Sequence, residues 1–225
     1  MFNFSKLTGI LLGQHCLLCG AGNAQNTGIC SDCLSDLPWH DTNSCPQCGL
    51  ASNGLTCGAC LRDTPHYDAT QAVFTYAYPA DAMLQRFKYG EMLALGHTFG
   101  QLLAQSTASR DVDMIIPMPM HPKRMQERGF NQALEIARHL DKRKLDTQCA
   151  IRQKLTPPQA SLPLKERVKN IKGAFAVNAD LTGKRIAIVD DVMTSGASLN
   201  ELAKTLKNAG AIHVECWVIA RTMPP

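Results

Sequence analysis

The fold of this chain is decided by the stretch Ile188-Val189-Asp190-Asp191-Val192-Met193-Thr194-Ser195-Gly196-Ala197-Ser198-Leu199. An apolar strand ends in two carboxylates, and a loop of hydroxyl-bearing and small residues then leads into a helix that begins near Ser198. Such a loop presents backbone N–H groups to an anion, and the positive end of the helix strengthens the attraction. Ligands of open parallel sheets bind at the carboxyl ends of the strands. The stretch therefore predicts a phosphate site beside Asp190 and Asp191, which suit ribose hydroxyls or a Mg2+ ion next to a polyphosphate.

An alternative for this stretch is a buried strand whose acids only cap a turn, but an ordinary strand-to-helix loop needs only one capping residue. The stretch also resembles the phosphoribosyl pyrophosphate (PRPP) motif of type I phosphoribosyltransferases, in which apolar residues precede two acids, a variable pair and Thr-[Thr/Ser]-Gly-x-[Thr/Ser]. The resemblance implies that Asp190 and Asp191 hold the ribose diol and take part in catalysis, and that Thr194 to Ser198 surround the 5′-phosphate. The implied PRPP-binding residues are Asp190, Asp191, Val192, Met193, Thr194, Ser195, Gly196, Ala197 and Ser198.

The composition is that of a globular protein. The chain has 225 residues, of which 45% are apolar, enough for one large domain or two modest ones. No stretch approaches the roughly 18 uninterrupted apolar residues of a membrane span. Residues 1–13 contain one lysine and a short apolar run without a small-residue cleavage site after it, so we do not interpret them as a signal peptide. We expect a cytoplasmic protein without membrane insertion.

Positive charge is concentrated in residues 121–172. They hold thirteen Lys and Arg residues against five Asp and Glu residues, although the net charge of the whole chain is only +4. A basic segment of this kind usually faces a polyphosphate or a nucleic acid. The other explanation is a solvated helix face, which we prefer for Lys142, Arg143 and Lys144.

Eight of the ten cysteines fall in the first 60 residues as four C-x-x-C pairs, a spacing that suits tetrahedral zinc. The expected ligands of two structural zinc sites are Cys16, Cys19, Cys30, Cys33, Cys45, Cys48, Cys57 and Cys60. A disulfide framework is the competing interpretation, and the regular spacing opposes it. Neighbouring pairs would form two successive ribbons and alternate pairs a cross-brace; we favour the ribbons. Cys149 and Cys216 stand alone and are expected to be buried apolar residues.

Strands and helices alternate after the cysteine-rich segment, which predicts a largely parallel sheet with helices on both faces. We expect a zinc-ribbon domain over residues 1–66 and an α/β domain over 67–225. Strands are expected at 69–76, 113–118, 185–189 and 213–219, and helices at 81–89, 91–104, 130–143 and from about 198 to 209. Residues 151–172 contain three prolines and are expected to be irregular or hairpin-like.

Basic side chains follow the strand that ends near Met118. In type I phosphoribosyltransferases the corresponding loop contacts pyrophosphate, which implies that role for Lys123, Arg124 and Arg128; the alternative is surface charge beside a helix start. His121 is more simply structural than a general base, and Asn131 is a candidate helix cap. Lys88 is either a further ligand contact or a surface cation. The segment marked by Arg152, Thr156, Gln159, Arg167 and Asn170 is a candidate loop for closing over a bound substrate.

Across nearly its whole length the sequence is similar to the ComF/GntX proteins. The shared features occur in the same order: cysteine pairs, Phe-Lys-Tyr, Pro-x-Pro, Arg-Gly-Phe-Asn-Gln, Thr-x-x-Gln, Arg-x-x-Asn and the PRPP motif. ComF members are associated with natural competence and GntX members with gluconate use or with DNA as a nutrient. The resemblance implies a type I phosphoribosyltransferase-like sheet behind a double zinc ribbon. It supplies no reaction, and the chain has no evident nucleobase-recognition segment at its C-terminus.

Two functions are therefore expected. The first is a Mg2+-dependent phosphoribosyltransferase-like enzyme that uses PRPP and an unidentified acceptor, with no side chain standing out as the general base. The second is a non-enzymatic PRPP- or nucleotide-binding factor in DNA uptake that contacts single-stranded DNA or a competence-machinery protein. The ribbon segment carries a net charge of −2, so a protein partner suits it better than DNA; ribbons that serve only as structural caps are the third possibility.

Overall fold

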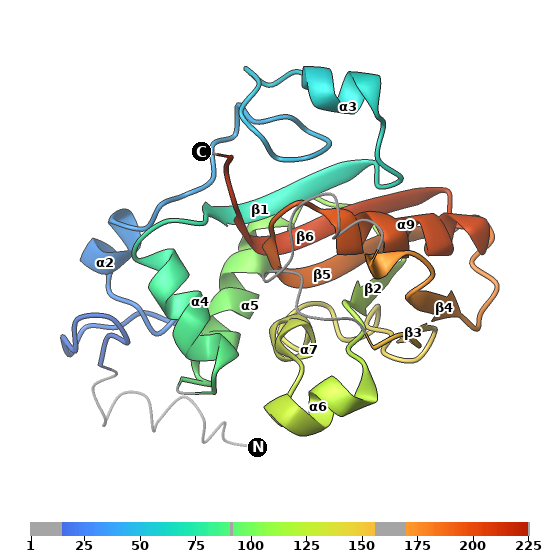
Figure 1. Cartoon of the computed structure of the whole chain (residues 1–225). Helices are drawn as coiled ribbons and strands as arrows, with labels where there is room; N and C mark the ends of the chain where they lie inside the picture. Colours follow the sequence, from blue (N-terminus) through green and yellow to red (C-terminus); the bar gives the residue numbers. More distant parts are fainter. Residues whose placement is uncertain (1–14, 91, 156–169, 225) are drawn as a thin grey trace.

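Four parallel strands form the central sheet, in the order β1-β6-β5-β2 (Figure 1). The computed structural model describes residues 15–90, 92–155 and 170–224. The strands are β1 (Ala69–Thr75), β2 (Met114–Pro117), β5 (Arg185–Met193) and β6 (His213–Arg221). All neighbours in the sheet are parallel, so the four carboxyl ends lie at one edge. The predicted parallel α/β fold is confirmed.

Strand β5 is longer than the sequence predicted. It continues past Val189 through both aspartates to Met193, because β6 runs alongside it as far as Arg221. The register pairs Asp190 with Val218 and Met193 with Arg221. The two carboxylates are therefore held on a rigid strand, and the loop begins only at Thr194.

Both faces of the sheet are buried, as expected for a parallel sheet. One face packs against α4 (Ala80–Lys88), α5 (Leu95–Ser106) and α7 (Gln132–Ala137), and the other packs against α9 (Ala197–Asn208), as Figure 1 shows. Successive residues of β5 alternate between the two cores: Ile186 and Ile188 face α9, whereas Ala187 and Val189 face the opposite layer. The predicted core face of α9, made of Leu199, Leu202, Ala203 and Leu206, is buried.

Helix boundaries differ from the prediction in three places. Helix α5 begins at Leu95, later than expected, and α7 ends at Ala137, earlier than expected. Beyond α7, the Asp141 carboxylate accepts the backbone N–H of Arg143 in a turn. Helix α6 (Pro122–Arg128) was not predicted. Proline at its first turn and the left-handed Gly129 after its last residue are the local signals that define it.

A small antiparallel pair, β3 (Ala150–Arg152) with β4 (Phe175–Val177), flanks the segment that was expected to be irregular or hairpin-like. Residues 156–169 lie outside the described residues, and with them Thr156, Gln159 and Arg167 of the predicted closing loop. The predicted absence of a signal peptide in residues 1–13 likewise concerns residues outside the described part.

The two cysteine-rich modules lie on opposite sides of the outer edge of β1. The first carries α2 (Ser31–Ser35) and packs with the α4–α5 layer, whereas the second carries α3 (Gly58–Arg62) and packs with the α9 layer. The connection between them crosses the edge: the His40 N–H donates to the Val73 carbonyl at 3.0 Å, and the Thr75 N–H donates to the Pro38 carbonyl at 2.8 Å. These bonds cover an edge strand that would otherwise expose unpaired backbone groups.

None of the helices in the described part of the chain has the length and apolarity that a membrane crossing requires.

Candidate functional site

A cavity of about 430 Å³ lies at the carboxyl edge of the sheet. Residues from the ends of all four strands line it: Tyr76 after β1, Met118 after β2, Asp190 near the end of β5 and Thr222 after β6. Ligands of open parallel sheets bind in this position, and the volume is in the usual range for a small-molecule site. The topology alone therefore assigns the candidate site to this edge.

The predicted ligand-binding stretch lies together in the lining. All nine residues from Asp190 to Ser198 contribute to it. The Asp191 N–H donates to the Asp190 carboxylate at 2.9 Å, and the Val192 N–H donates to the Asp191 carboxylate at 2.7 Å. Burial, and secondly the charge of Asp191, raise the pKa of Asp190 well above its usual range, and Lys88 opposes that shift. Ionising both adjacent carboxyl groups costs free energy because their negative charges repel each other. A ligand that donates hydrogen bonds or carries positive charge reduces that cost.

The loop after β5 is shaped to receive an anion. Gly196, at the N-cap of α9, has a φ of 74°, and no side chain caps the helix there. A β-carbon on Gly196 would lie 2.8 Å from Met193 Cε and 3.2 Å from Tyr67 Oη, so a larger residue would strain the left-handed backbone and require the Met193 side chain to move. The start of a 12-residue helix and its small-residue loop thus border the cavity beside the two aspartates.

Cationic side chains line the cavity from three elements. They are Lys88 at the end of α4, Arg124 and Arg128 on α6, and Arg152 at the end of β3. Arg152 stacks on Phe175, with its guanidinium carbon 5.6 Å from the ring centroid. Burial lowers the pKa of Arg152, and the negative charge of Asp190 counteracts this. A polyphosphate in the cavity would meet positive charge from several sides.

The predicted pyrophosphate loop is only partly in the lining. Arg124 and Arg128 belong to it, but Lys123 does not. The Lys123 N–H donates to His121 Nδ1 at 3.2 Å, so the histidine ring caps α6. This hydrogen bond supports the structural interpretation of His121, although its side chain also borders the cavity.

The side chains of Asn131 and Gln132 form hydrogen bonds that connect neighbouring elements of the cavity wall. The Asn131 side chain accepts the N–H groups of Ala133 and Leu134 and caps α7, as the sequence suggested, while its amide donates to the Met118 carbonyl at 3.1 Å. Gln132 accepts from Arg128 at 3.3 Å and donates to the Lys88 carbonyl at 3.2 Å. These bonds connect two of the cavity's cationic residues across two helices.

The sequence analysis missed four residues at or beside the site. Tyr76 and Gln85, joined by a hydrogen bond of 2.8 Å, and Thr222 all line the cavity. Tyr76 and Thr222 directly follow strands, and that position was the available signal. Arg221 is 4% exposed and donates to backbone carbonyls near the loop; its signal was a charged residue at the end of a long apolar strand.

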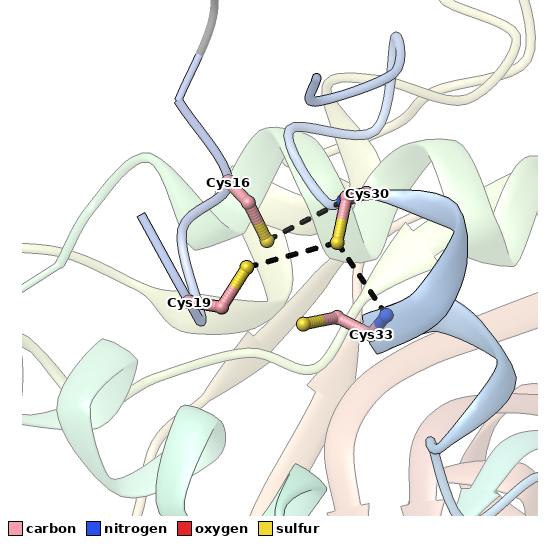
Figure 2. A group of neighbouring side chains, drawn as sticks. All are labelled: Cys16, Cys19, Cys30 and Cys33. Atoms are coloured by element: carbon pink, nitrogen blue, oxygen red, sulfur yellow. Dashed lines mark hydrogen bonds between the residues drawn. The ribbon is translucent and has the colours of Figure 1, made fainter. Parts of the chain in front are cut away.

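The eight N-terminal cysteines form two clusters of four, in the successive pairing that we favoured. Within each cluster the four Sγ atoms lie within 4.8 Å of one another. In Figure 2 the sulfur atoms of the first cluster point toward a common centre, with Cys19 and Cys30 sulfurs 3.7 Å apart. Zinc–sulfur bonds of about 2.3 Å in a tetrahedron require sulfur separations of roughly 3.8 Å. The residues present therefore fit zinc, and the closed four-sulfur sets are typical of structural sites.

Hydrogen bonds from backbone N–H groups lower the pKa of one cysteine in each cluster. Burial raises the pKa of Cys45, but hydrogen bonds from the backbone of Cys48, Cys57 and Gln47 outweigh it and bring the value to about 7. The pKa of the corresponding Cys16 in the first cluster falls to about 6 for the same reason. A lowered pKa favours the thiolate, which is the form that binds zinc.

The two remaining cysteines are buried, as predicted. Cys149 is 7% exposed and Cys216 is fully buried. Burial raises the pKa of both thiols, to about 12 for Cys149. Neither has the character of a reactive thiolate.

Two known protein families match separate parts of the chain. Residues 7–65 match the double zinc ribbon domain family, and residues 125–223 match the phosphoribosyl transferase domain family. The purine phosphoribosyltransferase from Pyrococcus horikoshii is a solved structure that aligns with a TM-score of 0.37 and 19% identity, over 56% of this chain and 73% of its own.

Relatives that match over most of their length are named for DNA utilization or for competence. The chain is 31% identical over 208 residues to the DNA utilization protein YhgH of Escherichia coli. The alignment covers 87% of this chain and 91% of the relative. It is 32% identical over 227 residues to competence protein F of Haemophilus influenzae, covering 92% and 96%. Competence protein ComFC of Streptococcus pneumoniae is 24% identical, over 92% of this chain and 100% of its own. The chain therefore belongs to the ComF/GntX family, in which a double zinc ribbon accompanies a phosphoribosyltransferase domain.

Proposed function

We propose that this protein binds PRPP together with Mg2+ in the cavity at the carboxyl edge of the sheet and acts as a phosphoribosyltransferase on an acceptor still to be identified. One observation carries the proposal: the two aspartates, the loop at the start of α9 and the cationic side chains converge on one cavity that the ends of all four parallel strands line. A sugar diol, a 5′-phosphate and a diphosphate require these three kinds of group.

Each part of the ligand contacts a different group of residues in the cavity. Asp190 and Asp191 accept hydrogen bonds from the ribose hydroxyls. The loop from Thr194 to Ser198 receives the 5′-phosphate at the start of α9. Arg124, Arg128 and Lys88 face the diphosphate, and Arg152 adds a further charge close to Asp190.

The reaction breaks the bond between ribose C1′ and the diphosphate oxygen and forms a bond from C1′ to the acceptor, whose proton leaves. Positive charge develops on the ribose ring, and the Asp190 and Asp191 carboxylates stabilise it. The basic side chains stabilise the negative charge on the departing diphosphate. Bound Mg2+ would add charge neutralisation of the diphosphate, and carboxylate oxygens of the kind offered by Asp190 and Asp191 are ligands that it prefers.

Isothermal calorimetry with PRPP tests the proposal. The protein should bind PRPP saturably when Mg2+ is present and much more weakly when it is absent. The double variant Asp190→Ala, Asp191→Ala should lose binding while it retains zinc and its circular dichroism spectrum. Normal PRPP binding by this folded variant would remove the site assignment.

A second candidate function is a non-enzymatic ligand-binding factor that contacts single-stranded DNA, as the names of the relatives suggest. Tyr78 and Tyr89, at the two ends of α4, are 81% and 71% exposed, and α4 also carries Arg86 and Lys88. Exposed aromatic rings beside cations suit unpaired bases. Binding of a fluorescent oligothymidine that weakens steeply with salt and with Tyr78→Ala would support this function, and binding insensitive to both would exclude it.

We further propose that the chain works as a ribbon domain over residues 1–66 and a ligand-binding domain over residues 67–225. Pro65 lies close to this boundary.

A further inference from the structure

Arg221 joins the second zinc ribbon to the loop beside the cavity. It ends β6 and is 4% exposed. Its Nε donates to the Cys48 carbonyl at 2.7 Å, and its Nη1 donates to the Met193 carbonyl at 2.9 Å and also to the Thr194 carbonyl. One guanidinium thus holds the backbone of a zinc-ligand residue and the backbone at the start of the phosphate loop.

Two further contacts tie the same ribbon to the same loop. The Thr70 hydroxyl donates to the Gln47 carbonyl at 2.6 Å and lies 3.9 Å from Met193 Sδ. The Gln47 side chain donates to the Tyr67 carbonyl at 3.1 Å, and the Tyr67 ring packs against Gly196. The knuckle between Cys45 and Cys48 is therefore connected to the phosphate loop through Thr70 and Tyr67.

Charge makes this connection sensitive to the metal. Among the residues that the structure describes, no carboxylate forms an ion pair with Arg221. A buried guanidinium needs compensating negative charge. Four thiolates around Zn2+ carry a net charge of −2, so a loaded second site would supply that charge close to Arg221, and zinc also fixes the backbone of its knuckle.

The first ribbon provides a contrast within the same chain. Its contacts run to α5, where the Thr98 hydroxyl donates to the Thr27 carbonyl at 2.6 Å and His97 lies 3.1 Å from the Asn26 carbonyl. Within the described part of this ribbon, no residue forms a hydrogen bond to the phosphate loop, and its buried cysteines pack in the opposite core.

We propose that Arg221 is a positioning residue that couples zinc occupancy of the second site, Cys45, Cys48, Cys57 and Cys60, to binding of the phosphoribosyl ligand, whereas the first site is uncoupled. The coupling rests on the proposed function for its ligand. Because coupling between two binding sites is reciprocal, PRPP must tighten zinc binding at the second site by the factor by which that zinc tightens PRPP.

Zinc release to a chromogenic chelator measures one direction of the coupling. At equilibrium, PRPP with Mg2+ should raise the chelator concentration that removes zinc from the second site at least about fivefold and leave that for the first site unchanged. The single-site variants Cys33→Ser and Cys57→Ser assign the two phases. In Arg221→Met the ligand effect on release should disappear. Arg221→Lys keeps the charge but lacks the guanidinium group that reaches both the Cys48 and the Met193 carbonyls. It should retain both zinc ions and still lose most of the effect of PRPP on zinc release.

The reverse direction compares ligand affinities. Cys57→Ser should weaken PRPP binding at least about fivefold more than the matched Cys33→Ser does. Equal losses in the two variants, or ligand-independent zinc release from the second site of a protein that binds PRPP, would overturn the coupling and leave the proposed function standing.

Hydrogen exchange decides the inference without a ligand. Backbone amides from Ser195 to Leu199 should exchange faster in Cys57→Ser than in Cys33→Ser. If the wild-type protein failed to bind PRPP, the proposed function would fail, and faster exchange in Cys57→Ser would still support the link through Arg221. Equal exchange in the two variants would overturn it.

Discussion

The carboxylates of Asp190 and Asp191 line the cavity from β5, which is paired with β6 along this stretch. Burial and the neighbouring acid raise the pKa of Asp190, so the folded chain holds a proton there that the unfolded chain releases. Folded-state stability is therefore lost as the pH rises from about 4, the unfolded pKa, through the raised folded pKa. The proposed function of the site explains why this cost is retained: a bound ligand supplies the partners that the empty site lacks.

Asp190→Asn removes this cost. The variant should be more stable than the wild type at pH 8, by about 2–4 °C in melting temperature for each 1 kcal/mol relieved, and the difference should shrink toward pH 4. Thermal unfolding followed by circular dichroism across this range measures it.

Asp180→Asn is the matched control with the opposite sign. Hydrogen bonds from the Thr182 hydroxyl and backbone lower the pKa of Asp180, so its ionised form stabilises the folded chain above the unfolded pKa. This variant should lose stability at pH 8 and differ little at pH 3. A loss of stability at pH 8 in Asp190→Asn would contradict the assignment of a strained acid pair.

Individual residues were predictable where the chemistry is local in the sequence. The acid pair and the loop after it are contiguous, so Asp190 to Ser198 were found together. Tyr67 and Arg221 were missed because their importance arises from packing between β6, the loop and a zinc knuckle more than 170 positions away from Arg221. Lys123 lies outside the cavity lining, on the short helix α6 that the sequence analysis did not predict.

The strand–loop–helix unit of β5 and α9 is the element that defines the site. The loop turns at Gly196, whose left-handed conformation disfavours a β-carbon and whose neighbours Met193 and Tyr67 would have to shift to accept one. The pattern of this unit is strong because a strand, a turn signal and an amphipathic helix follow one another. Strand ends and short helices were less predictable: β5 was extended by its partner β6, and α7 ends at Ala137, short of the expected end at residue 143.

Gly196→Ala tests the loop as an element. The substitution should cost about 1–2 kcal/mol of unfolding free energy through the left-handed backbone alone, and the crowding by Met193 and Tyr67 should also weaken PRPP binding. Chemical denaturation and calorimetry measure the two effects.

Gly183→Ala is the control for this substitution. Gly183 has a φ of 76°, and a β-carbon added to it would meet no atom within 4 Å beyond its chain neighbours, so it shares the backbone strain without the crowding. The variant should lose similar stability and keep its ligand affinity. Equal affinity losses in both variants would show that the loop geometry is not what binds the ligand.

At the scale of the whole molecule, the two zinc modules lie on opposite sides of the outer edge of β1, and the segment between them covers that edge. The cysteine spacing predicted two zinc sites, because each C-x-x-C knuckle is local, but it left the pairing open between successive ribbons, which we favoured, and a cross-brace. Their placement on either side of the sheet was not predictable, since it depends on the short crossing at Pro38 to His40.

Cys45→Ser tests the metal content of the molecule. The variant should retain one zinc ion per chain where the wild type holds two, and its melting temperature should fall because the second module supports the α9 face. Elemental analysis counts the metal. Cys149→Ser, which replaces a buried cysteine outside both clusters, should keep two zinc ions. Unchanged zinc in Cys45→Ser would contradict the two-site arrangement.

The central claim is that the cavity at the carboxyl edge of the sheet binds a phosphoribosyl ligand, and titration of the zinc-loaded protein with PRPP tests it most directly. Calorimetry with and without Mg2+ should show saturable binding to one site per chain that depends on Mg2+ and disappears in Asp190→Ala, Asp191→Ala. Absence of binding to the wild-type protein under both conditions would contradict the claim.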